Sequence, residues 1–136
     1  MQAPFERFCA DEAATRGLGA EWAKRWQAGD LVLLEGDLGA GKTTFVRGVL
    51  EGLGHMGPVR SPTFNLLQTF PTIPPVLHVD LYRLPSAQGL GLEEYFESHL
   101  VLVEWPDRAP ELQTIPGVWL VKIVPQNEGR QITIQR

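Results

Sequence analysis

The sequence predicts a single α/β domain over residues 1–136, with a mixed, mostly parallel sheet flanked by helices and a C-terminal β-hairpin. Three observations predict it. A short apolar run precedes a glycine-rich segment and an amphipathic helix, two further apolar runs each end in a carboxylate, and the last part of the chain alternates in polarity. The length of 136 residues is that of one domain, and no internal repeat or long linker divides it.

The first half of the chain predicts a helix, a strand and a second helix. In residues 11–27 apolar side chains recur every four positions, with Asp11 suited to the N-cap and Gly29 to the stop, so this segment reads as an amphipathic helix. The run Leu31–Glu35 is apolar and bounded by glycine and aspartate, which favours a strand buried on both faces. Residues 42–53 carry their apolar side chains on one helical face.

The second half predicts four strands. Val76–Asp80 and Leu100–Glu104 are apolar runs typical of a buried parallel sheet, and residues 89–99 between them read as a loop with a short helix. Residues 118–124 form a further strand, and residues 132–134 alternate as a half-exposed strand does. These last two strands predict a hairpin on the edge of the sheet.

The segment between the first strand and the second helix matches the phosphate-loop pattern G-x-x-x-x-G-K-S/T from Gly36 to Thr43. Glycines let the backbone turn so that its N–H groups face an anion, and the helix start adds partial positive charge. Lys42 can reach the β- and γ-phosphates, and the Thr43 hydroxyl can coordinate Mg²⁺. The predicted nucleotide contacts are Leu38, Gly39, Ala40, Gly41, Lys42, Thr43 and Thr44.

Two carboxylates follow buried strands in the manner expected of acids that serve phosphoryl transfer. Glu104 is the preferred candidate for the metal shell or for water activation, because its strand is the more apolar, and Asp80 is then a supporting acid or a switch contact. An ordinary alternative is that each carboxylate caps a turn or pairs with Arg83 or Arg108.

Further positions, beyond the phosphate loop and the two carboxylates, have side chains that could contribute to the site. Ser61 and Thr63, in the segment Arg60 to Phe64, resemble the hydroxyls of a nucleotide-sensing switch loop, or they belong to an ordinary Ser-Pro turn. Trp105 packs near the nucleotide or in the rim of the core. His78 alternates with Val79 in a buried strand and is interpreted as a core residue rather than a ligand or base.

Composition limits the expected partners and cellular location of the protein. The formal net charge of −4 supplies no general attraction to nucleic acid, so any RNA is expected to be held through a partner. Cys9 is the single cysteine, and neither a membrane-spanning run nor a secretory signal is evident. A cytoplasmic protein without membrane contact is the expectation.

Five segments in order resemble the TsaE family: GDLGAGKTTFVRG, SPTF, HVDLYRL, GLEEYF and VEWP. The resemblance covers nearly the whole chain. It implies a compact P-loop NTPase domain that binds ATP with Mg²⁺, hydrolyses it weakly when alone, and acts on TsaD- and TsaB-type partners. Those partners transfer a threonylcarbamoyl group to adenosine 37 of transfer RNAs that read ANN codons.

The resemblance also implies residue roles. The glycine loop, Lys42 and Thr43 hold ATP and Mg²⁺, Glu104 is a metal or catalytic acid beside Trp105, and Asp80 and Thr63 are functionally important. Residues 11–15 border the base or ribose. Phe70 stands where the family usually has tyrosine and the chain stops at Arg136 without a longer tail, which bears on peripheral contacts such as any made by Arg130.

Two other functions share the phosphate loop. A small-molecule or nucleoside kinase normally adds an arginine-rich lid, whereas the arginines here are scattered. A nucleotide-binding interaction module that never hydrolyses ATP is the second alternative. A GTPase is disfavoured because the chain has no N-K-x-D motif.

Overall fold

The computed structural model describes residues 3–59 and 67–136, which form a seven-stranded mixed sheet with the order β1-β7-β6-β2-β5-β4-β3. The strands are β1 (Phe5–Cys9), β2 (Leu31–Glu35), β3 (Leu67–Phe70), β4 (Val76–Asp80), β5 (Leu100–Glu104), β6 (Trp119–Gln126) and β7 (Gly129–Gln135). The centre is parallel, through the pairs β6–β2, β2–β5 and β5–β4, and antiparallel pairs complete both sides. The predicted fold class is therefore confirmed.

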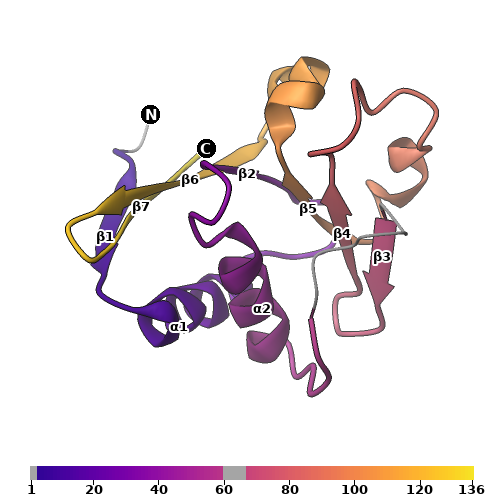
Figure 1. Ribbon diagram of the computed structural model, residues 1–136. Helices are drawn as coiled ribbons and strands as arrows, with labels where there is room; N and C mark the ends of the chain where they lie inside the picture. The colour runs from indigo at the N-terminus through magenta and orange to yellow at the C-terminus, as the bar shows by residue number, and fades with distance from the viewer. Residues whose placement is uncertain (1–2, 60–66) are drawn as a thin grey trace.

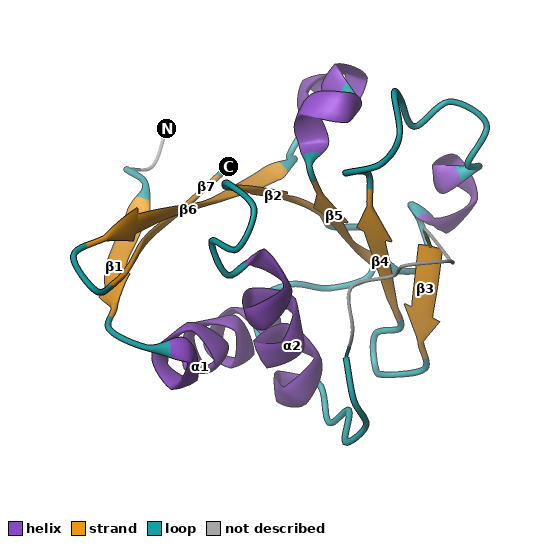
Figure 2. Ribbon diagram, in the orientation of Figure 1, coloured by secondary structure: helices purple, strands orange, loops and turns teal. Residues whose placement is uncertain are grey.

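The two α-helices, α1 (Glu12–Ala23) and α2 (Lys42–Gly52), lie against the same face of the sheet, as Figures 1 and 2 show. Val32 and Leu34 of β2 belong to the hydrophobic core on the helix side, and the alternating Leu31 and Leu33 belong to a second core. The second core lies under loops and three 3₁₀ helices, η1 (Leu92–Tyr95), η2 (Pro106–Arg108) and η3 (Pro110–Thr114). A central strand that is apolar on both faces is what this two-sided covering requires.

Several element boundaries differ from those predicted. The first helix is capped by Asp11, whose carboxylate accepts a hydrogen bond from the Ala14 amide at 2.8 Å, but it ends at Ala23 instead of residue 27. Strands β1 and β3 were not predicted. The β6–β7 hairpin forms, yet it does not lie on the edge, because β1 pairs with β7 and takes that place.

Glycines allow α1 and α2 to approach each other closely. A Cβ atom at Gly48 would lie 2.2 Å from the Arg16 carbonyl oxygen, and one at Gly19 would lie 2.5 Å from the Phe45 carbonyl oxygen. Both distances are far inside van der Waals contact, so the helix backbones touch without intervening side chains. This contact positions α2, and with it the loop that precedes α2.

We expect Gly48→Ala to destabilise the protein by about 2–3 kcal/mol, because the added methyl group must push two backbones apart. The matched control is Gly17→Ala in α1, where a Cβ would meet nothing within 4 Å. Gly17→Ala should instead stabilise by about 0.5–1 kcal/mol through helix propensity and a less disordered unfolded chain. Urea unfolding of the two variants measures both effects, and equal midpoints would contradict the proposed contact.

No helix in the described part of the chain combines the length and apolar character needed to cross a bilayer.

Candidate functional site

The predicted phosphate loop connects the carboxyl end of β2 to the first residue of α2. Gly39 and Gly41 have φ values of +78° and +113°, a region that favours glycine, and a Cβ at Gly36 would lie 2.7 Å from the Ile123 carbonyl oxygen. Gly41 occupies the N-cap of α2 without a side-chain capping bond. The loop therefore has the shape of an anion cradle, and the first N–H groups of α2 are left available to an anion.

Lys42 folds back over the loop. Its side chain is 5% exposed, and its ammonium group donates to the carbonyl oxygens of Gly36 and of Asp37, the latter at 3.0 Å. The Nζ atom also lies 3.9 Å from the centre of the Trp105 ring. Burial lowers the pKa of Lys42, and nearby carboxylates oppose that shift, in decreasing order Glu104, Asp80, Asp37 and Asp107.

Thr43 and Glu104 meet directly, as their predicted roles require. The Thr43 hydroxyl, in the first turn of α2, donates to the Glu104 carboxylate at 3.1 Å and 3.3 Å from its two oxygens. Glu104 ends β5 and is only 3% exposed. A hydroxyl and a carboxylate beside a phosphate cradle form the all-oxygen donor set that suits Mg²⁺, so these residues fit a magnesium ion shared with a nucleotide.

Asp80 ends β4 in register with Glu104, so the two predicted carboxylates lie on neighbouring strands at the same edge of the sheet. Its carboxylate accepts a hydrogen bond from the Tyr82 amide at 3.0 Å. The negative charge of Asp80 also opposes the lowering of the Lys42 pKa by burial. The two strand-end acids therefore lie side by side at the carboxyl ends of β4 and β5.

Trp105 follows Glu104 with a φ of +63°, a conformation uncommon for a residue other than glycine. Its ring lies against Lys42 on one side, and the Tyr82 ring is 4.8 Å away. Of the remaining predicted residues, Leu38 lies in the loop with 70% exposure. Ser61 and Thr63 lie outside the described residues.

Two residues at the site were not given this role by the sequence. His78 is fully buried, as expected of a core residue, yet its Nε2 atom lies 2.5 Å from a Glu104 oxygen. Arg130, at the start of β7, donates to the carbonyl oxygens of Ala40 at 2.5 Å and Gly39 at 3.4 Å, so it braces the loop. The sequence did contain one indication that His78 lies near the site, because it stands two residues before Asp80 and therefore on the same face of the strand. No local pattern indicated the contact of Arg130, which is 90 residues away from Ala40 in the sequence.

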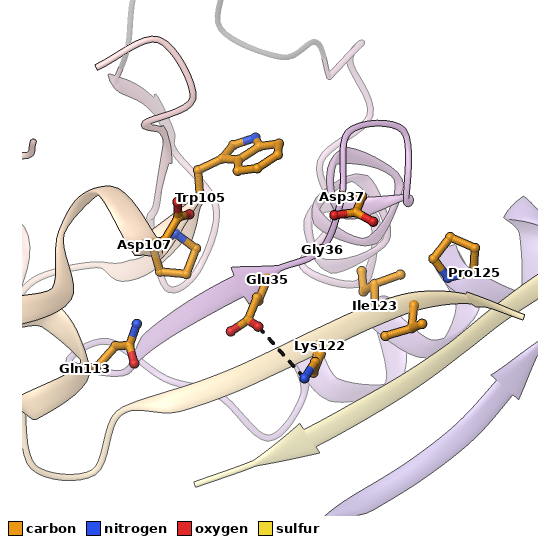
Figure 3. A pocket seen from close by; sticks show the side chains of 11 residues that line it. Glu35, Gly36, Asp37, Trp105, Asp107, Gln113, Lys122, Ile123 and Pro125 are labelled. Atoms are coloured by element: carbon orange, nitrogen blue, oxygen red, sulfur yellow. Dashed lines mark ion pairs between the residues drawn. The ribbon is translucent and has the colours of Figure 1, made fainter. Parts of the chain in front are cut away.

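Two cavities flank the loop. One of about 250 Å³ lies between the loop, the start of α1 and the β6–β7 turn, and its lining includes Asp11, Glu12, Thr15, Thr44, Glu128 and Arg130. This arrangement brings residues 11–15 beside the loop. The other, of about 400 Å³, is shown in Figure 3: Trp105 and Asp107 lie on one side, Lys122 and Pro125 of β6 on the other, and Glu35 pairs with Lys122 at 4.0 Å.

Comparison with known proteins points to one family. The family model described as "Threonylcarbamoyl adenosine biosynthesis protein TsaE" matches residues 9–132. Three curated relatives carry the name "tRNA threonylcarbamoyladenosine biosynthesis protein TsaE". The protein from Streptomyces coelicolor is 46% identical over 66% of this chain and 66% of its own length, and that from Nostoc sp. is 42% identical over 76% and 68%. The protein from Rickettsia typhi is 36% identical over 92% of this chain and 90% of its own length.

A crystal structure of YdiB from Bacillus subtilis has the same fold. It superposes with a TM-score of 0.84 at 33% sequence identity, and the match covers 98% of this chain and 86% of that one. The fold is therefore shared along nearly the full length of the chain.

Proposed function

The chain belongs to the TsaE family, and on that premise we propose that it binds and hydrolyses ATP in the biosynthesis of threonylcarbamoyladenosine on transfer RNA. The observation that carries the proposal is the meeting of Thr43 and Glu104 at the mouth of the phosphate loop. A structural glycine turn would have no need of a buried carboxylate held against the hydroxyl that follows the lysine. A site for a magnesium-bound triphosphate requires both groups.

The residues around the loop receive distinct roles under this proposal. The amides of residues 38–44 hold the phosphates, and Lys42 turns its ammonium group from the loop carbonyls to the β- and γ-phosphate oxygens. The bound magnesium ion supplies charge neutralisation on the phosphates. Thr43 and Glu104 would hold this ion, Glu104 would also orient the attacking water, and Asp80 would support Glu104 from the neighbouring strand.

The cavity beside the start of α1 is the proposed site of the base and ribose. It opens directly beside Gly39, Gly41 and Thr44, so a nucleotide whose phosphates lie in the loop can place its nucleoside there. Its lining contains Asp11 and Thr15, with carboxylate and hydroxyl groups that suit ribose hydroxyls and an exocyclic amine. Trp105 lies on the opposite side of the loop, near the end where Lys42 emerges.

Hydrolysis is proposed to reset a partner complex of TsaD- and TsaB-type proteins, with residues 61–63 as the nucleotide-sensing switch and transfer RNA held by the partners. The net charge of −4 supports indirect contact with RNA. The loop presents an exposed apolar side chain, Leu38, and Tyr82 is exposed next to Trp105, so a partner could reach the rim of the site. Work on transfer RNA implies a cytoplasmic protein.

The test is phosphate release by the purified protein with ATP and Mg²⁺, alone and with TsaD- and TsaB-type proteins of the same organism. We expect slow release alone and at least tenfold faster release with the partners, which should co-purify with the chain in ATP and separate in ADP. Binding of ATP with no release under either condition would leave only the non-hydrolysing module. Phosphate transferred to an added small molecule in place of water would indicate a kinase.

A further inference from the structure

Two buried side chains and one partly buried side chain, from three different elements, form a continuous hydrogen-bonded series. His78 of β4 contacts Glu104 of β5, and Glu104 accepts from Thr43 of α2. His78 is 0% exposed and Glu104 is 3% exposed, so water has almost no access to this contact. The series therefore runs from the middle of the sheet to the first turn after the phosphate loop.

The sheet register explains why His78 reaches Glu104. The Cα partner of His78 on β5 is Leu102, and Glu104 lies two residues further along on the same face. The distance from Nε2 to Oε2 is 2.5 Å, which is at the short end for a hydrogen bond. An apolar side chain would fill this position without making the contact.

The contact has a direction that follows from the chemistry of the two groups. An ionised carboxylate can only accept hydrogen bonds, so Nε2 carries the proton and donates it toward Oε2. The other ring nitrogen, Nδ1, is buried without a hydrogen-bond partner among the described residues, so the contact to Glu104 is the polar interaction that the ring makes there. A buried carboxylate without such a donor would be costly, because few water molecules could replace it.

We propose that His78 is a positioning residue that holds the Glu104 carboxylate in the orientation needed to align the Thr43 hydroxyl. The Thr43 proton points to Glu104, so the direction of the carboxylate decides where the hydroxyl lone pairs face. Partners behind a metal-binding group commonly contribute 10- to 100-fold to metal affinity or activity. This inference rests on the proposed function, because it concerns magnesium-dependent nucleotide binding at the same site.

The test compares three substitutions at one position. His78→Gln can place an amide N–H near the position of Nε2, His78→Asn can place one only near Nδ1, and His78→Leu has none. ATP and ADP affinities are measured by calorimetry in Mg²⁺ and in EDTA, and kcat and KM are measured for hydrolysis. Magnesium increases the ATP affinity of the wild type, and we expect this increase to be at least tenfold smaller in His78→Leu and His78→Asn. The kcat of these two variants should also fall at least tenfold. His78→Gln should keep most of both.

Affinity in EDTA should stay within about twofold of the wild type in all three variants, because the loop amides and Lys42 are unchanged. In a Glu104→Ala background, which has no side-chain oxygen for His78 to contact, His78→Leu should cost nothing further, since its effect passes through the carboxylate. If His78→Leu does not fold, the comparison of His78→Gln with His78→Asn decides in its place. Equal behaviour of those two variants, or an additive cost with Glu104→Ala, would overturn the assignment.

Failure of the proposed function gives a different result. If the wild-type protein shows no magnesium-dependent gain in ATP affinity, the function proposed for the site is wrong. If the wild type shows the gain and His78→Leu keeps all of it, only the role of His78 is wrong. The two failures are thus separated by the wild-type measurement alone.

Discussion

Replacing Lys42 with methionine should lower ATP affinity about 100-fold and remove detectable hydrolysis. The ammonium group is the cation nearest the phosphates in the proposed site, and a charge-assisted hydrogen bond of this kind is worth roughly 2–3 kcal/mol, which corresponds to about 100-fold in affinity. Methionine keeps the stem that packs near Trp105 and removes only the charge. Calorimetry with ATP and Mg²⁺ measures the binding, and phosphate release measures the activity.

The same substitution should not weaken the fold. Burial lowers the pKa of Lys42, so the folded protein binds this proton less tightly than the unfolded chain does. The charged form of Lys42 is therefore less favourable in the folded protein than in the unfolded chain. Its removal offsets the loss of the hydrogen bonds to the Gly36 and Asp37 carbonyls, so the urea midpoint should stay close to that of the wild type. Lys122→Met is the matched control, because Lys122 is an exposed lysine beside the loop that pairs loosely with Glu35. If both variants bind ATP equally well, the proposed phosphate site is wrong.

Replacing Glu104 with glutamine should reduce hydrolysis by roughly 100- to 1,000-fold, as expected when a group that activates water loses its charge. Glutamine has nearly the same shape as glutamate, so the contacts to Thr43 and His78 can persist in part. Binding of ATP in EDTA should change by less than about threefold, because the amides of the loop do not depend on this carboxylate. Phosphate release at saturating ATP isolates the effect on the chemical step.

Glu35→Gln is the control for Glu104→Gln. Glu35 also ends a parallel strand and directly precedes the loop, but it faces Lys122 on the surface instead of Thr43. This control should hydrolyse ATP at nearly the wild-type rate. Partner-stimulated turnover that survives Glu104→Gln would show that the roles assigned to Thr43 and Glu104 are mistaken.

The parts of the fold that the sequence predicted well are those with strong local signals. Leu31–Glu35, Val76–Asp80 and Leu100–Glu104 have the predicted boundaries, because strands buried on both faces are continuous apolar runs ended by a polar residue. Asp11 was recognisable as an N-cap for the same reason, since capping is a local interaction. The phosphate loop combines a demanding pattern with the required strand and helix.

The missed elements depend on contacts between distant parts of the chain. Strand β1 exists because Phe5–Cys9 pairs with β7, and β3 is a four-residue strand made by pairing with β4. The first helix ends four residues earlier than its apolar spacing indicated, although Trp26 remains 3% exposed and packs against Trp22 at 5.6 Å between ring centroids. The apolar spacing correctly marked Trp26 as buried, but a buried residue need not be helical, so the predicted helix was too long.

In the candidate site, too, the residues marked by a local pattern were predicted and those that depend on distant contacts were not. The pattern located Lys42 and Thr43, and strand ends located Asp80 and Glu104, since both are statements about one segment at a time. The contact of His78 with Glu104 required the register of β4 against β5, and the contact of Arg130 with Ala40 required the placement of β7 beside the loop. Neither register nor strand order can be read from a single short segment.

The close approach of α1 and α2 limits how the molecule can rearrange. With backbone against backbone at Gly19 and Gly48, neither helix can slide or roll past the other without steric overlap. We therefore expect α1 and α2 to move together in any conformational change and not to shear past each other. If the proposed hydrolysis of ATP changes the conformation of the protein, we expect the change in segments other than this helix pair, such as the phosphate loop.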